Sequence, residues 1–153
     1  MNEHTITINI AKLIERVRLA AQKSQRSESS ISILAVSKTR PCADLRHAFN
    51  SGLTEFGENY LQEALTKIEQ LADLPLTWHF IGPIQSNKTR AIAENFDWVH
   101  TVDRLKIAQR LSDQRPAHLA PLQVCIQVNI SGEDSKSGIA LEALPSLTKQ
   151  LLK

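Results

Sequence analysis

The sequence predicts an α/β protein whose parallel strands follow the (β/α)8 TIM-barrel pattern, with only about the first five βα units present. Short apolar runs alternate with segments of helical periodicity, and crossover helices of this kind require parallel strands. No G-x-G-x-x-G follows the first strand, and polar residues recur at strand ends, as on the catalytic face of a barrel. An open doubly wound sheet is the alternative. Because a whole barrel needs roughly 200 residues or more, we expect residues 1–153 to form a single partial barrel domain.

An amphipathic helix opens the chain. Apolar residues recur at the spacing of one helix face, which predicts a helix over about residues 7–25. An apolar strand over residues 31–37 follows, and then a helix over residues 42–51, which Gly52 ends as a C-terminal cap. These elements form the first unit of the series.

The same alternation continues along the rest of the chain without a linker. Further apolar runs predict strands over residues 54–57, 77–81, 98–101 and 122–128. Helical periodicity predicts helices over residues 60–74, 86–95, 103–112 and 141–153. Asp103 is the expected N-terminal cap of its helix.

Composition and charge exclude several classes of protein. A net charge of +2 without a basic run argues against a nucleic-acid partner. Cys42 and Cys125 form no C-x-x-C pair and have no histidine at ligand spacing, so we expect reduced thiols rather than a disulfide or a metal site. No stretch approaches a membrane span and no secretory signal opens the chain, so we expect a soluble, cytoplasmic protein without a membrane partner.

Lys38 ends the first strand, where α/β sheets and barrels bind their ligands. The apolar strand before it and Arg40 after it both disfavour the charged ammonium, and an uncharged amine can attack an aldehyde. The alternative is an ordinary surface lysine at a strand end. Ser37 has no His/Asp partner that the sequence reveals, which disfavours a serine nucleophile.

Two further polar residues are candidates for the same site. Asn59 follows the second strand and can point its amide into a site, or it can simply cap the next helix. Alternation along the third strand places His79 on the face opposite Trp78 and Phe80, so that His79 can lie beneath a ligand in a barrel. A buried histidine bonded to a backbone carbonyl is the alternative.

Two loops each carry a lysine that is a further candidate for the ligand site. Lys88 lies in a polar segment after the third strand, where a helix start offers free amides. Lys136 lies in the loop 129–138, which follows the clearest strand and carries two glycines. Each segment taken alone is also consistent with a solvated turn or a capped helix start.

Several motifs occur in one order along the chain. They are LAVSKT at 34–39, FGENY at 56–60, WHFIGPIQSNK at 78–88, HTVDR at 100–104, DQRP at 113–116, VNI at 128–130 and SKSG at 135–138. This set closely resembles the YggS/PROSC family, the pyridoxal phosphate homeostasis proteins, over nearly the whole chain.

The resemblance implies an alanine-racemase-like TIM barrel without the second domain of the racemases. It implies pyridoxal 5′-phosphate as cofactor, held as a Schiff base on Lys38, with Asn59 beside the ring and His79 near the floor of the site. Lys136 matches a loop lysine thought to influence cofactor exchange. The implied role is that of a cofactor carrier or buffer in vitamin B6 homeostasis, with apo-enzymes that use the cofactor as partners and without catalytic turnover.

The sequence is shorter than the family pattern, and the missing part would supply the last three strands. Loops after strands seven and eight of a barrel commonly hold phosphate, so the phosphate-binding residues are expected in that missing part. An incomplete barrel exposes a sheet edge, so we expect either a monomer or self-association through that edge.

Two alternatives to a binding protein stay open. A racemase-like enzyme using pyridoxal phosphate needs a base on the opposite face of the ring, and nothing in the sequence gives Tyr60, the only tyrosine, that role. The other alternative is a truncated chain that binds no cofactor. The sequence favours the non-catalytic binding protein.

Overall fold

A parallel sheet forms the centre of the structure. The computed structural model describes residues 3–133 and 135–152. Its main sheet has five strands, and each neighbouring pair is parallel. These strands are β1 Leu34–Val36, β2 Glu55–Glu58, β3 Thr77–Phe80, β4 Trp98–Val102 and β5 Gln123–Ile126. A second, two-stranded parallel sheet consists of β6 Val128–Asn129 and β7 Ile139–Ala140.

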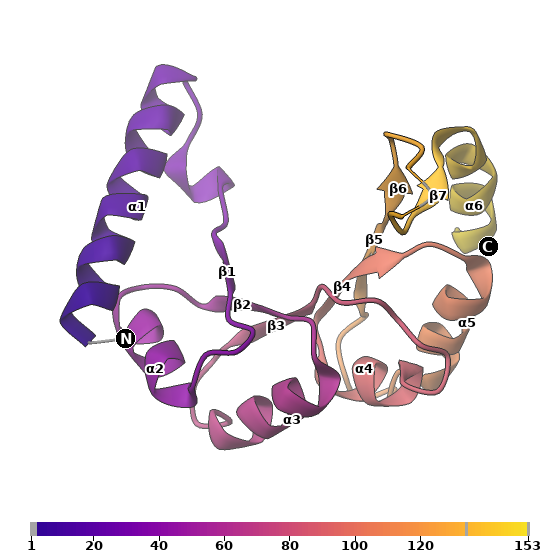
Figure 1. The fold of residues 1–153 in the computed structure, drawn as a ribbon, viewed down its shortest axis with the longest axis horizontal. Coiled ribbons are helices and arrows are strands. Elements are labelled where there is room, and N and C mark those ends of the chain that lie inside the picture. The colour runs from indigo at the N-terminus through magenta and orange to yellow at the C-terminus, as the bar shows by residue number, and fades with distance from the viewer. Residues whose placement is uncertain (1–2, 134, 153) are drawn as a thin grey trace.

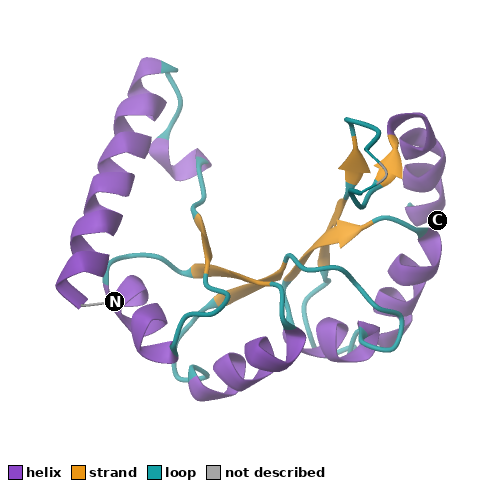
Figure 2. Cartoon of the chain, viewed as in Figure 1, coloured by secondary structure: helices purple, strands orange, loops and turns teal. Residues whose placement is uncertain are grey.

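The order of the strands decides between the two predicted architectures. The main sheet runs β1-β2-β3-β4-β5, so that each strand lies beside the one before it. This order is typical of a (β/α)8 barrel, whereas a doubly wound sheet reverses its strand order part-way across. Figures 1 and 2 show the sheet as an open, curved arc with helices on its outer side. The partial barrel is confirmed and the doubly wound alternative is wrong.

Helices connect the strands and cover the outer face of the sheet (Figure 1). They are α1 Glu3–Lys23, α2 Cys42–Asn50, α3 Leu61–Gln70, α4 Thr89–Asn95, α5 Leu105–Gln114 and α6 Leu144–Leu151. Two short 3-10 helices, η1 Glu28–Ser30 and η2 Leu141–Ala143, precede β1 and α6. Helix α1 comes before the first strand and packs against α2.

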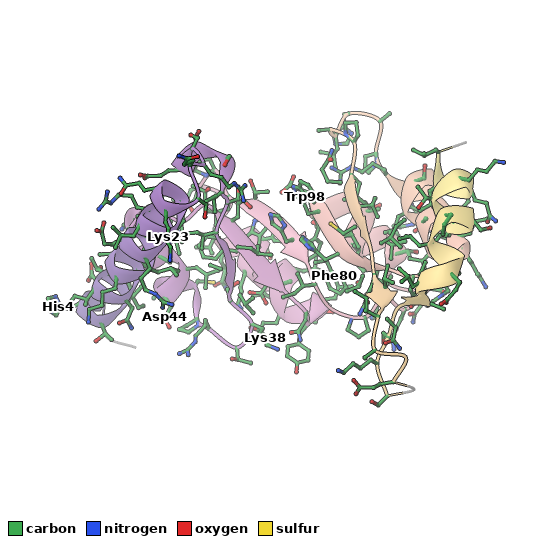
Figure 3. All side chains as sticks on the ribbon, turned by 90° about the horizontal axis from the view of Figure 1, so that it is seen from above. His4, Lys23, Lys38, Asp44, Phe80 and Trp98 are labelled. Atoms are coloured by element: carbon green, nitrogen blue, oxygen red, sulfur yellow. The ribbon has the colours of Figure 1, made fainter. Side chains whose placement is uncertain are left out.

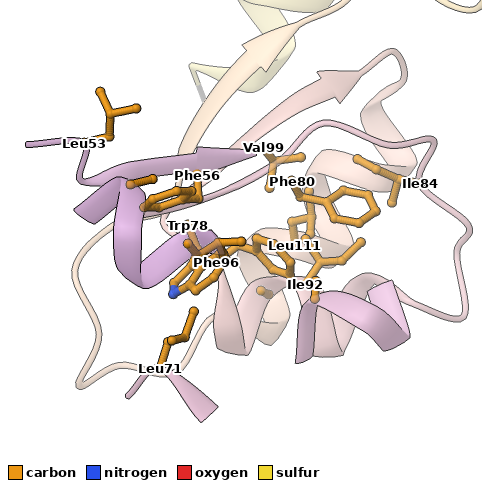
Figure 4. Close-up of a cluster of buried hydrophobic side chains, with 14 of the residues drawn as sticks. Leu53, Phe56, Leu71, Trp78, Phe80, Ile84, Ile92, Phe96, Val99 and Leu111 are labelled. Atoms are coloured by element: carbon orange, nitrogen blue, oxygen red, sulfur yellow. The ribbon is translucent and has the colours of Figure 1, made fainter. Parts of the chain in front are cut away.

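The hydrophobic core lies between the sheet and these helices (Figure 4). Trp78 and Phe80 of β3 point outward into it, and their rings lie 6.1 Å from Phe56 and 5.3 Å from Phe96. Since alternate residues of a strand face opposite sides of the sheet, His79 faces the inner side, as predicted. The inner side of the arc is therefore the face on which polar residues can form a site.

Helix α1 begins earlier than the predicted residue 7. Ile6 is buried together with Ile10, so the apolar stripe extends one turn toward the N-terminus. The helix ends at Lys23 because Gln25 adopts a φ of 53° and the next N–H donates to Ala21 O at 2.9 Å. This left-handed residue is a common helix terminator.

The cap predicted for α5 is wrong. Arg104, not Asp103, immediately precedes the helix, and no side chain caps it. The Asp103 carboxylate instead accepts a hydrogen bond from Arg104 at 2.8 Å. Helices α4 and α6 also begin later than predicted, because turns or a 3-10 helix occupy the preceding residues.

The strand predicted over 122–128 is interrupted at Gln127. Its N–H donates to Val102 O at 2.8 Å, whereas its carbonyl accepts from the N–H of Ile139 at 2.9 Å. The chain therefore changes partner at this residue, from β4 to β7, and one apolar run gives two strands. The first strand is also shorter than predicted, since only Leu34–Val36 pairs with β2.

We expect the chain to self-associate through the edge strand β1, which pairs on one side only. Val36 on this edge is 55% exposed. The weight-average mass in sedimentation equilibrium should rise with concentration, and a Val36→Lys charge on the edge should weaken that association severalfold. Leu19→Lys, on a 51% exposed residue of α1, is the matched control and should leave it unchanged. Equal effects of the two variants would contradict association through the sheet edge.

Candidate functional site

Lys38 lies in the turn that leaves β1, and it is labelled in Figure 3. The N–H of Arg40 donates to Ser37 O at 3.0 Å, which closes the turn around Lys38 and Thr39. Lys38 is exposed, so the apolar strand before it does not bury the amine. In the part of the chain that the structure describes, its side chain makes no hydrogen bond or ion pair. The amine is therefore accessible to a ligand.

Asn59 lies at the neighbouring strand end. The register of the sheet pairs Val36 with Gly57, and the next residues facing the same way are Lys38 and Asn59. Tyr60 directly precedes α3 and no side chain caps that helix, so the interpretation of Asn59 as a helix cap is wrong. Its Oδ1 is buried and has no hydrogen-bond partner among the described residues. Buried acceptors are usually paired, so a water or a ligand can donate a hydrogen bond to Asn59 Oδ1 at this position.

Gly82 brings the loop after β3 against Asn59. A Cβ atom at Gly82 would lie 2.4 Å from Asn59 O, so only glycine permits this approach of the two backbones. The hydroxyl of Thr101 donates to Gly82 O at 2.6 Å. The loops after β2 and β3 and the C-terminal end of β4 therefore form one continuous rim at the carboxyl ends of the strands.

His79 lies on the inner wall of the arc, below this rim. It pairs in register with Gly57, two residues before Asn59. Its Nδ1 lies 2.9 Å from His100 Nε2, and its ring stacks on Trp98 with a centroid distance of 5.6 Å and an angle of 7°. Its Nε2 is buried without a hydrogen-bond partner among the described residues, with Glu55 Oε2 at 3.5 Å. The interpretation of a histidine satisfied by a backbone carbonyl is therefore wrong.

The histidine pair should make stability depend on pH. Burial holds the pKa of His79 below its ordinary value of 6.5, and the charge of His100 lowers that pKa further, against opposing effects of Glu55 and Asp97. Burial also lowers the pKa of His100. Below pH 6.5 the unfolded chain therefore binds more protons at these residues than the folded chain, so protonation favours unfolding.

We expect the free energy of unfolding in urea to decrease as the pH falls from about 8 to about 5. His79→Gln should reduce this decrease, because a glutamine takes up no proton. His118→Gln, at an exposed histidine outside the inner wall, should leave the pH dependence as it is. If both variants show the same pH dependence of unfolding as the unmodified chain, the histidine pair does not cause that dependence.

The structure does not bring Lys136 to Lys38. Lys136 lies in the loop between β6 and β7, beyond β5, whereas Lys38 follows β1 at the opposite edge of the sheet. Its Nζ pairs with Glu133 at 2.7 Å and is 60% exposed. Lys88 immediately precedes α4 and is exposed. Of the predicted residues, Lys38, Asn59 and His79 lie on or directly after the neighbouring strands β1, β2 and β3, whereas Lys136 lies beyond β5.

The sequence interpretation missed a buried polar network behind Lys38. Lys67 of α3 donates to Glu58 Oε1 at 2.7 Å, to Ser37 O at 2.8 Å and to Glu63 Oε1 at 2.5 Å. The Lys67 ammonium holds the pKa of Glu63 below its ordinary value. The four-residue spacing of Glu63 and Lys67 was the available signal, because such pairs meet on a helix. The proximity of Glu58 and Ser37 depends on strand pairing and had no local signal.

Metal and disulfide chemistry find no support in the described residues. Within 3–133 and 135–152, no group of three or more His, Cys, Asp or Glu side chains could hold a metal ion. Cys42 and Cys125 are both free cysteines. No helix in those ranges combines the length and the hydropathy that a membrane crossing requires.

Residues 8–153 match the family described as alanine racemase, N-terminal domain. The chain belongs to this family. Within it, the chain is 66% identical over 145 residues to a pyridoxal phosphate homeostasis protein of Pseudomonas aeruginosa, with 95% of this chain and 63% of that protein covered. The predicted resemblance to the pyridoxal phosphate homeostasis proteins is confirmed. The chain spans less than two thirds of the length of that relative.

Two solved structures agree with the fold. PipY of Synechococcus elongatus PCC7942, solved with pyridoxal phosphate bound, matches with a TM-score of 0.69 and 40% identity, covering 87% of this chain and 63% of that one. Alanine racemase of E. faecalis matches with a TM-score of 0.65 at 18% identity, covering 99% of this chain and 38% of that one, which shows a shared fold alone.

Proposed function

We propose that the chain is a pyridoxal 5′-phosphate-binding protein of vitamin B6 homeostasis, in which Lys38 carries the cofactor covalently. The observation that carries the proposal is the accessible amine of Lys38 at a strand end, beside the unpaired acceptor of Asn59. Condensation of an amine with an aldehyde forms a C=N bond and releases one water, so it needs no oxidant or reductant. Pyridoxal phosphate supplies the aldehyde and, when bound, an electron-withdrawing ring.

The described residues fit the ring portion of this cofactor. Asn59 Oδ1 and His79 Nε2 are both buried and lack hydrogen-bond partners among the described residues, which is costly unless a ligand or water pairs with them. We infer that Asn59 orients a ligand at the rim and that His79 forms the wall below it. The phosphate cradle is a separate requirement, and we expect it in the loops after the seventh and eighth strands, which the five-stranded sheet does not include.

We infer that residues 1–153 form one partial barrel unit. We also infer that this unit binds pyridoxal phosphate without catalytic turnover. Racemisation requires a proton acceptor on each face of the ring. Tyr60, the only tyrosine, is 55% exposed and directly precedes α3 rather than lying on the inner wall. The name of the Pseudomonas aeruginosa relative, a homeostasis protein, supports the same role. Loss of deuterium from the α-carbon of an amino acid, catalysed by the chain, would contradict it.

The test is to mix the purified chain with pyridoxal phosphate, reduce with borohydride and map the modified lysines by mass spectrometry. We expect one equivalent of label, confined to Lys38. Lys88 and Lys136 serve as internal controls, because both are exposed lysines that follow strands of this chain. Label scattered over exposed lysines, or none at all, would contradict the proposal.

A further inference from the structure

A buried ion pair lies directly behind the Lys38 turn. Lys67 Nζ of α3 lies 2.7 Å from Glu58 Oε1 of β2, and their side chains are 5% and 0% exposed. Glu63, one helical turn before Lys67, shares the ammonium and is 31% exposed. Buried charges are costly unless they are paired and hydrogen-bonded. This group therefore keeps a fixed arrangement between the sheet and α3.

The same ion-paired side chains hold both peptide groups that flank Lys38. The carbonyl of the Ser37–Lys38 peptide accepts from Lys67 Nζ at 2.8 Å. The N–H of the Lys38–Thr39 peptide donates to Glu63 Oε1 at 2.6 Å. With both neighbouring peptide planes held, the two backbone dihedrals of Lys38 are restricted, and with them the direction of its Cα–Cβ bond.

The backbone after Lys38 also needs such support. Thr39 has a φ of 64°, a left-handed conformation that a β-branched residue rarely adopts. Conformations of this kind persist only where surrounding contacts enforce them. The hydrogen bond from Thr39 N–H to Glu63 is one such contact, and the bond from Ser37 Oγ to Glu58 Oε1 at 2.6 Å anchors the other end of the turn.

We propose that Glu63 and Lys67 are positioning residues, which fix the Lys38 turn from the helix side so that the amine meets an incoming aldehyde in one orientation. This inference rests on the proposed function of Lys38 and extends it to residues of α3 behind the Lys38 turn. The anchoring side chains lie on the covered face of the sheet, whereas Lys38 itself is exposed. The site can thus hold its nucleophile in place without occupying the space that the ligand needs.

The test compares three variants on the same helix. Glu63→Ala removes the acceptor of the Thr39 amide, Glu63→Gln keeps an oxygen acceptor without the charge, and Glu69→Ala is the matched control at an exposed glutamate of α3. Hydrogen exchange of the Thr39 amide and urea unfolding are measured without cofactor. The rate of pyridoxal phosphate attachment to Lys38 is then measured by borohydride trapping.

We expect Glu63→Ala to speed exchange of the Thr39 amide and to slow labelling of Lys38 by about 10- to 100-fold, because small misplacements of a reacting group have effects of that size. Glu63→Gln should restore most of the protection of the Thr39 amide and most of the labelling rate of Lys38. Glu69→Ala should change neither the exchange nor the labelling rate. Unchanged Thr39 exchange in Glu63→Ala would overturn the anchor, and faster exchange with an unchanged labelling rate would overturn the positioning role. If the unmodified chain takes up no label, the proposed function fails, while Thr39 exchange still decides whether the anchor exists.

Discussion

The Lys38→Ala variant should lose all covalent attachment of pyridoxal phosphate and still unfold at nearly the same urea concentration as the unmodified chain. We expect a complete loss because Lys38 follows β1, the strand that pairs with β2 directly before Asn59. The stability change is small because Lys38 is exposed, and surface substitutions away from special features usually change stability by about 0.5 kcal/mol or less. Reduction with borohydride followed by peptide mapping measures the first effect, and urea titration the second.

Lys88→Ala and Lys136→Ala are the controls for Lys38→Ala. Both replace exposed lysines, and both should retain stoichiometric label at Lys38. A label that persists in Lys38→Ala would transfer the attachment site to another lysine. An equal loss of label in all three variants would show that attachment depends on overall positive charge rather than on the position of one amine.

Lys67→Met should destabilise the chain by about 3–5 kcal/mol, the usual effect of removing one partner of a buried ion pair. Methionine fills a similar volume but leaves the Glu58 carboxylate without its cation, and that side chain is 0% exposed. The Ser37 carbonyl also loses a donor. Urea unfolding monitored by far-ultraviolet circular dichroism measures the loss.

A double variant distinguishes the stability lost with the packing of Lys67 from the stability lost because the Glu58 carboxylate is left without its cation. Lys67→Met combined with Glu58→Leu removes both charges, so it should be more stable than Lys67→Met alone, because apolar replacement of a whole buried pair is often tolerated. Lys106→Met, at an exposed lysine of α5, is the control and should change the free energy of unfolding by about 0.5 kcal/mol or less. A double variant less stable than the single one would mean that the hydrogen bonds, not the charges, dominate.

The parts of this structure that the sequence predicts are those with local signals. The apolar run before Lys38 and the alternation around His79 are patterns of neighbouring residues. They predict a strand before Lys38, which the structure has over Leu34–Val36, and they place His79 on the face opposite Trp78. The FGENY and WHFIGPIQSNK motifs identify the family because they are specific strings, which the match over residues 8–153 supports.

The contacts that join separate elements could not be predicted in this way. The pairing of His79 with His100 depends on strand register across β3 and β4, and that of Glu58 with Ser37 on register across β1 and β2. A lysine in an amphipathic helix is expected on the solvent-exposed face. Lys67 is buried instead, because it pairs with the carboxylate of Glu58 in strand β2. Contacts of this kind depend on which strands and helices lie side by side, and no short stretch of sequence encodes that arrangement.

The two tryptophans of the chain lie on opposite faces of the sheet. Trp78 packs in the core with its ring 6.1 Å from Phe56 (Figure 4), whereas Trp98 stacks on His79 on the inner wall. Intrinsic tryptophan fluorescence of the native chain therefore comes from two emitters in different surroundings. A Trp78→Phe variant would leave one emitter against the inner wall, so that its quenching reports a ligand there, while Trp98→Phe would leave an emitter that reports only the integrity of the core. The molecule thus carries an optical probe for each of its two layers.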